Sequence, residues 1–382
     1  MIAISQAVDW ALKNIPEEPE KAAQFNAWNR RMEAEARNMW KPECCALCGK
    51  KIDRPCDSHT VPHFVLQNLV DDRGKIYFSF KFLNEISFWN TEGRPKSAGI
   101  FKLLCNDCDN QVFKIYEDPK ALLNGISSQA ATAIALKNLL FVKCKREQEI
   151  LAMELILNEL RDPDANPKTL ACFKKDYAAI GYLYYDCYNK QQIYRLDLKD
   201  LNEEIETAKK ALQDGDDIYR CIYHRVLDYT IPVAYQGAMT IPSSFYGDVV
   251  NNTLDTSVKT KMEYLHTVVF PLKNQKSVVA LLVDRRAENY RFFESDFNEL
   301  SEDERLAMVN YLLFFFEEDY YLSPRLPERI FKSSAVKKLV GKTYNQRDFR
   351  KIEACRETQE MVPAYRRFKC VENLLAPEYR IS

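Results

Sequence analysis

The sequence has few of the features that mark membrane-bound, secreted or disordered proteins. Only 10 glycines and 16 prolines occur among 382 residues, so we expect a chain that is folded over most of its length. The longest apolar runs, at 278–284 and 311–316, are far shorter than the roughly 20 residues that cross a bilayer. The N-terminus also lacks a basic segment followed by an apolar one. We therefore expect a cytoplasmic protein without a membrane partner.

The chain also lacks an excess of charge of either sign. Its 54 lysines and arginines nearly cancel its 55 aspartates and glutamates, so no global field attracts nucleic acid, and any such binding must come from a local patch. The clearest patch is residues 332–370, where eleven basic residues stand against four acidic ones. Interleaved aromatic residues make this stretch a candidate for contact with phosphates and bases, although a solvated helix face is the alternative.

Cysteine is the residue type whose pattern is informative. The chain has twelve cysteines, too few for a disulfide scaffold at this length, but four form two CxxC pairs, Cys45 with Cys48 and Cys105 with Cys108. A CxxC turn places two thiolates at the separation that tetrahedral zinc requires, so we predict a structural four-cysteine zinc site. Cys44 is an alternative to Cys45, and unrelated buried cysteines are the competing interpretation.

Histidine is rare, and two of the four histidines lie between the cysteine pairs. In "SHTVPHF", His59 stands just before a proline-restricted turn, from which an imidazole could deprotonate water. A purely structural histidine is the alternative. His63 could be a second ligand, but a partly buried histidine against Phe64 is the more common case. His224 and His266 stand alone in predicted strands, without a ligand pattern.

The order of these motifs resembles that of HNH endonucleases. "SHTVPHFVL" and "KLLCNDCDNQVFKIYED" are similar to a group of bacterial HNH-like proteins with a Ser-His-x-x-Pro motif, often found in phage-defence settings. The resemblance covers about residues 42–118 and implies a treble-clef or ββα-metal fold. It implies that His59 is the general base and that Asp109 binds Mg²⁺ or Mn²⁺, with Asp57 or Glu117 as the second carboxylate.

Two departures from the family pattern put catalysis in doubt. Ser58 stands where active members usually have Asp, Glu or His, and the asparagine that orients the base is missing or elsewhere. We therefore keep two hypotheses. The favoured one is a metal-dependent nuclease that cleaves DNA or RNA. The alternative is a non-catalytic zinc module that binds nucleic acid or a partner protein.

The remaining sequence predicts an α+β protein. We expect a helical pattern over 120–160, strands at 180–188 and 191–198, a hairpin at 264–284, and a helix from a capping box at Ser301 to Leu322. The predicted organisation is a helical arm (1–41), an HNH-like zinc domain (42–118), a helical connector (119–166), an α+β domain with an antiparallel sheet (168–330) and a basic tail (331–382). The α+β domain is a possible protein-contact or targeting element by elimination only.

Overall fold

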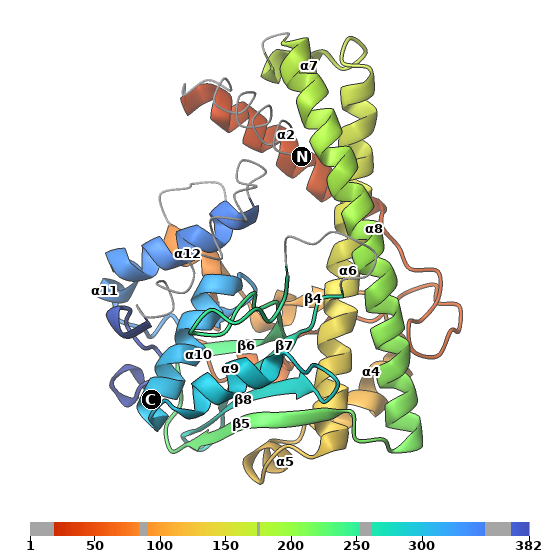
Figure 1. Ribbon diagram of the computed structural model, residues 1–382. Helices are drawn as coiled ribbons and strands as arrows, with labels where there is room; N and C mark the ends of the chain where they lie inside the picture. The colour runs from red at the N-terminus through yellow and green to blue at the C-terminus, as the bar shows by residue number, and fades with distance from the viewer. Residues whose placement is uncertain (1–18, 84–90, 174–175, 253–260, 348–367, 382) are drawn as a thin grey trace. The chain divides into compact units, whose positions relative to one another are not determined.

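The computed structural model describes five stretches of the chain, residues 19–83, 91–173, 176–252, 261–347 and 368–381. It combines helices with antiparallel sheet, as predicted (Figure 1). The chain divides into two compact units. Of the described residues, 19–43, 142–173 and 176–203 form the helical unit, and the remainder form the sheet unit. Each unit is assembled from several chain segments.

The helical unit is built around an aromatic contact between helices. It contains helix α2 (Pro19–Met39), the later part of α6 (Ser128–Arg161), α7 (Pro167–Cys172) and the first part of α8 (Tyr177–Asp214). Trp28 packs edge-on against Phe173, with ring centroids 5.9 Å apart, and its indole nitrogen donates to Glu159 at 2.7 Å. Arg31 also pairs with Glu159 at 2.8 Å, so one carboxylate joins two positions of α2 to α6.

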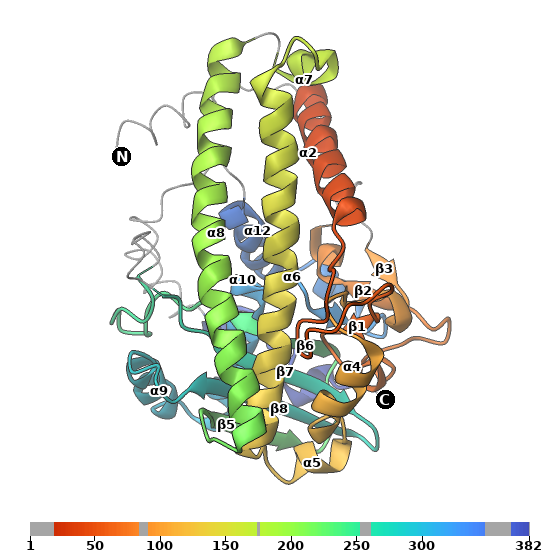
Figure 2. The same ribbon diagram turned by 90° about the vertical axis from the view of Figure 1, so that its right-hand side faces the viewer.

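The prediction of two strands at 180–188 and 191–198 is wrong, because helix α8 runs through both segments (Figure 2). Tyrosine and isoleucine favour strands locally, but tertiary packing overrides this preference. Ile180 and Cys187 are buried seven residues apart, on the same face of the helix. Tyr185 and Tyr188 are exposed instead, which gives the segment the periodicity of an amphipathic helix.

The sheet unit contains one large antiparallel sheet. Within the described residues this sheet has seven strands in the order β3-β2-β9-β6-β7-β8-β5. The strands are β2 (Ile76–Phe78), β3 (Glu92–Gly93), β5 (Tyr219–Leu227), β6 (Val233–Met239), β7 (Leu265–Leu272), β8 (Lys276–Asp284) and β9 (Tyr321–Leu322). A separate two-stranded sheet pairs β1 (Ser58–His59) with β4 (Ile100–Phe101). Strands β2 and β3 come from the segment between the two cysteine pairs, so this segment is continuous with the large sheet.

The predicted hairpin is confirmed as β7 and β8. Its turn places Asn274 and Gln275 at positive φ, 62° and 54°, a conformation that asparagine tolerates better than most residues. The capping box is also confirmed, because Ser301 and Glu304 cap α10 (Glu302–Phe316) reciprocally. The predicted end of this helix at Leu322 is wrong. Tyr321 and Leu322 leave the helix and form β9, whose partners β2 and β6 satisfy their backbone groups.

Helices cover both faces of the large sheet within its own unit. On one face, the core joins strand residues such as Val269 and Leu281 to Phe293 of α9 (Tyr290–Asn298) and to the apolar residues of α10 (Figure 1). On the other face lies the first part of α6, where Asn138 donates to the carbonyl of Gly237 at 2.8 Å. The shorter helices of this unit are α3 (His63–Leu66), α4 (Asn106–Val112), α5 (Pro119–Leu123), α11 (Glu328–Phe331) and α12 (Ser334–Arg347).

Candidate metal centre and histidine site

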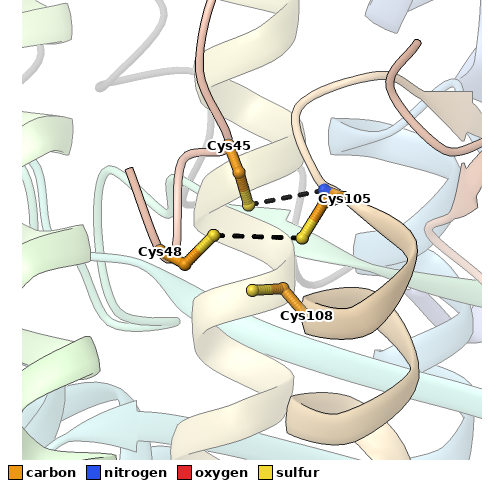
Figure 3. Close-up of side chains that lie close together, drawn as sticks. All are labelled: Cys45, Cys48, Cys105 and Cys108. Carbon is orange, nitrogen blue, oxygen red and sulfur yellow. Dashed lines mark hydrogen bonds between the residues drawn. The ribbon is translucent and has the colours of Figure 1, made fainter. Parts of the chain in front are cut away.

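The four predicted cysteines converge. One sulfur from each of Cys45, Cys48, Cys105 and Cys108 lies within 4.8 Å of the others. Figure 3 shows the thiols pointing toward one another, two from the loop after α2 and two from the start of α4. The sulfurs of Cys48 and Cys105 are 3.9 Å apart, close to the separation of about 3.8 Å that tetrahedral Zn–S bonds near 2.3 Å impose. Cys44 is exposed and is not part of this cluster.

Backbone hydrogen bonds hold the two cysteine segments together. Ala46 donates to the carbonyl of Leu103 at 2.9 Å, and Cys56 donates to that of Leu104 at 2.8 Å. Gly49 closes the first knuckle at φ 69°, where a side chain would be strained, and its amide donates to Cys45 at 2.9 Å. The ligand positions are therefore fixed by the fold and do not depend on the sulfurs alone.

The electrostatics of the thiol cluster favour a cation. Burial raises the pKa of Cys45, but the backbone amides of Cys48, Cys105 and Leu47 outweigh burial, so the pKa falls to about 7. The pKa of Cys108 is raised by burial and by the neighbouring thiols, because further negative charge accumulates there. A divalent cation removes this penalty by stabilising all four thiolates. The donor set and spacing fit a structural metal such as zinc.

His59 lies on β1, in the chain segment between the two cysteine pairs. Its strand pairs with β4, so that Ser58 lies opposite Phe101 and His59 opposite Ile100. Neighbouring strand residues point to opposite faces, which directs Ser58 and His59 away from each other. Burial lowers the pKa of His59, His63 adds to the lowering, and backbone groups of Pro95 and Lys96 oppose it. His59 therefore holds a neutral ring at pH 7.

Among the described residues, no acid pairs with the Nε2 atom of the His59 ring. Its Nε2 atom is buried and has no hydrogen-bond partner among the described residues. His63 packs edge-on against this ring, with centroids 5.6 Å apart, but is itself exposed rather than partly buried as expected. A general base needs access to the water that it deprotonates. The buried His59 Nε2 atom does not have this access.

Asp109 lies on the Ser58 side, within what we call the carboxylate cluster: Ser58, Asp109, Glu117 and Lys137. Ser58 donates a hydrogen bond to Asp109 Oδ1 at 2.5 Å. Lys137 of α6 places its ammonium 2.8 Å from Glu117 Oε1 and 3.6 Å from Asp109 Oδ1. The lysine side chain is only 2% exposed. Two of the predicted ion ligands, Asp109 and Glu117, thus come together, but around an ammonium group.

The other predicted ion ligand, Asp57, does not join this cluster. It is 60% exposed and lies 3.5 Å from Lys102, in a pair of surface character. The two carboxylates of the cluster, Asp109 and Glu117, are already paired with the ammonium of Lys137. Ser58 supplies a hydroxyl where the resemblance implies an acid. These residues do not fit a resident Mg²⁺ or Mn²⁺ ion, and we derive no reaction step through one.

Sequence reasoning missed Lys137, although the sequence carries a signal for it. Lys137 and Asn138 interrupt the apolar run "AIALKNLL", and a charge on a buried helix face requires a partner. Arg94 and Lys96, which flank Pro95 beside His59, were missed as well. The other two histidines lie in strands as predicted: His224 contacts the carbonyl of Leu122 at 2.8 Å, and His266 is buried in β7.

Comparison of the chain with protein-family models, curated proteins and solved structures finds no match. None of the helices in the described residues combines the length and the apolar character that a membrane crossing requires. Of the eleven basic residues in the stretch 332–370 that was predicted to contact nucleic acid, five fall on residues 348–367, which lie outside the described residues.

Proposed function

We propose that residues 42–118 form a zinc-held, HNH-like module that binds nucleic acid through its phosphates, on the side of the module that carries His59. The contact of Ser58 with Asp109 at 2.5 Å supports the HNH-like arrangement of this module most directly. The resemblance to HNH proteins implies that these two positions meet across the strand and the helix, although the sequence places them 51 residues apart. The four thiols give the same segment a metal-held frame.

The surface near His59 has the chemistry of a phosphate contact. Arg94 and Lys96 flank Pro95 at the short helix Pro95–Ser97, and both are exposed. Backbone groups of Pro95 and Lys96 lie against the His59 ring, and His63 is exposed next to it. Exposed cations beside the exposed His63 imidazole suit the oxygens of a phosphodiester, and phosphate contacts supply most sequence-independent affinity for nucleic acid. A local patch of this kind is compatible with a net charge of −1.

We favour a binding function over cleavage because the two groups that an HNH reaction would use, His59 and Asp109, are not arranged for it. His59 Nε2 is shielded, and no carboxylate among the described residues hydrogen-bonds to the ring. Asp109, the implied ion ligand, is engaged by Ser58 and Lys137. A nuclease would need both groups to rearrange before it could activate water at a scissile bond.

Metal-dependent nuclease activity is the second candidate. One observation favours it: burial lowers the pKa of His59, so the ring is neutral at pH 7, as a general base must be. In this proposal His59 accepts the proton of the attacking water, and the remainder of the sheet unit targets or regulates the module, with phage defence as the setting that the family resemblance suggests.

Retention and cleavage assays on the same protein separate the two candidates. The full chain is incubated with plasmid, single-stranded DNA and RNA, with and without Mg²⁺ or Mn²⁺, beside His59→Ala and Asp109→Ala. Metal-independent retention without cleavage supports the binding module. Nicking that both substitutions abolish would establish the nuclease instead.

Charge reversal locates the binding surface. The double variant Arg94→Glu, Lys96→Glu should weaken retention at low salt. The slope of log K against log salt concentration should become shallower by about 2, which corresponds to the loss of two phosphate contacts. A matched control, Lys114→Glu with Lys120→Glu, changes the net charge equally at two other exposed positions of the sheet unit. Equal losses in both double variants would contradict a phosphate contact at the Pro95 turn.

A further inference from the structure

The carboxylate cluster contains its own cation. We propose that the ammonium of Lys137 is the resident cation of this cluster, so that Asp109 and Glu117 bind no Mg²⁺ or Mn²⁺ in the native protein. The inference deepens the proposed function. It rests on the HNH-like arrangement proposed there, in which Asp109 stands at the position of the catalytic ion ligand. Its test is metal binding, and does not depend on whether nucleic acid is retained or cut.

The contacts of Lys137 leave little of its charge for another partner. The ammonium lies 2.8 Å from Glu117 Oε1, 3.6 Å from Asp109 Oδ1 and 4.5 Å from the centre of the Phe113 ring. Cations are attracted both to carboxylates and to the face of an aromatic ring. Three groups from the α4 segment thus surround one nitrogen atom supplied by α6.

Hydrogen bonds of the neighbouring residue hold the α6 backbone in the position from which Lys137 reaches Asp109 and Glu117. The next residue, Asn138, donates to the carbonyl of Gly237 at 2.8 Å and accepts from the Gln236 amide at 3.0 Å. Gln236 also donates to the hydroxyl of Tyr116 at 3.2 Å. These buried hydrogen bonds tie α6 to β6 beside the cluster, so the helix cannot turn to withdraw the lysine without breaking them.

A divalent ion would have to displace this ammonium group. Mg²⁺ and Mn²⁺ bind carboxylate oxygens at about 2.1 Å, in the space that the Lys137 nitrogen shares with both carboxylates. Two cations in that space repel each other, and the lysine side chain is 2% exposed, so the displaced charge has no direct path to water. The acid that would strengthen ion binding is replaced by Ser58, whose neutral hydroxyl contributes no charge.

Removal of the ammonium should convert the cluster into an ion site. Lys137→Ala leaves two carboxylates and the Ser58 hydroxyl around a vacated volume, a set of oxygen donors that Mn²⁺ accepts. Zinc-loaded full-length protein is titrated with Mn²⁺ and free Mn²⁺ is followed by electron paramagnetic resonance. We expect no site at millimolar Mn²⁺ in the wild type, one site in Lys137→Ala, and its loss in Lys137→Ala with Asp109→Asn.

The wild type alone can overturn the inference. If it binds one Mn²⁺ that Asp109→Asn or Glu117→Gln removes, the lysine is not the resident cation. The comparison of the wild type with Asp109→Asn also tests the proposal if Lys137→Ala does not fold. Identical Mn²⁺ titrations of these two proteins support the proposal. A folded Lys137→Ala protein that gains no site would count against it. None of these outcomes alters the nucleic-acid assays above, so the two proposals can fail separately.

Discussion

Two clusters of acidic side chains, one of thiols and one of carboxylates, draw residues from the short segment 105–117, and they differ in how their negative charge is balanced. The thiol cluster brings together Cys45, Cys48, Cys105 and Cys108. The carboxylate cluster brings together Asp109 and Glu117 and pairs both with the single ammonium of Lys137. The first arrangement suits an external cation, and the second already contains one.

Because of this difference, the stability of the two clusters should depend on different groups. Four thiolates at metal-ligand spacing couple the fold to metal binding, because an unfolded chain has no preformed site. A lysine that pairs with two carboxylates couples the fold to a side chain on α6. Loss of metal should therefore affect the first cluster, and loss of one lysine the second.

The largest effect should come from the thiol cluster. Replacing Cys108 with Ser removes one of four ligands, and structural zinc sites contribute on the order of 10 kcal/mol to folding. We expect zinc content to fall from one ion per chain to none, with unfolding of the segment around α4. Zinc release measured with a colorimetric chelator, beside thermal unfolding, checks both expectations.

Cys44→Ser is the matched control for this substitution. Cys44 is exposed and outside the cluster, although it directly precedes Cys45 and fits a CxxxC spacing. Zinc content and thermal stability should match those of the wild type. Loss of zinc from Cys44→Ser, with retention in Cys45→Ser, would reverse the ligand assignment.

A smaller effect should follow from removal of the Lys137 charge. Lys137→Met keeps most of the side-chain volume but leaves Asp109 and Glu117, which are 21% and 31% exposed, without their counter-charge. Breaking a buried ion pair at one partner costs about 3–5 kcal/mol. The free energy of unfolding in urea should fall by this amount, and Glu117→Gln in the same chain should recover part of it.

The surface pair of Lys102 with Asp57 provides the comparison. Their side chains are 57% and 60% exposed, and the ion pair spans 3.5 Å. Exposed pairs contribute less than about 1 kcal/mol, so Lys102→Met should be close to neutral. Equal losses from Lys102→Met and Lys137→Met would show that burial does not distinguish the two lysines.

The sequence was sufficient to predict the thiol cluster but only part of the carboxylate cluster. The CxxC spacing is a local constraint, and it correctly identified all four sulfurs across the 56 residues that separate the pairs. Asp109 and Glu117 were also selected, on the family resemblance. Their partner Lys137 was not, because it reaches them from another helix, and no local pattern shows which buried acid a distant lysine will meet.

The orientation of His59 and the wrong strand prediction within α8 show the same limit, that contacts between distant residues cannot be read from local sequence. That Ser58 rather than His59 faces Asp109 depends on strand register, since a shift by one residue exchanges the two faces. The tyrosine-rich segment of α8 was misassigned because its local preference for strands is weaker than the packing of Ile180 and Cys187. Predictions held where residues close in sequence decide the structure, and failed where distant contacts do.

A third buried group in the sheet unit carries no charge at all, and it predicts the smallest effect. His266 is fully buried, and burial lowers its pKa to about 3, with Asp284 opposing the shift. Asn138 lies 3.4 Å from its Nδ1 atom, so the neutral ring has a polar neighbour. In an unfolded chain the pKa of histidine is about 6.5. Between these values the unfolded state binds a proton that the folded state does not.

The sign of the pH dependence follows from this difference in bound protons. The stability associated with a neutral His266 is fully present above pH 6.5 and is lost as the pH falls toward 3, by about 1.4 kcal/mol per pH unit. At pH 5 the wild type should therefore have lost about 2 kcal/mol more than His266→Gln, relative to pH 7. Urea unfolding of both proteins at the two pH values measures this difference. Acid effects on the thiol and carboxylate clusters are common to both proteins and cancel, so parallel losses of stability would mean that His266 is protonated in the folded state.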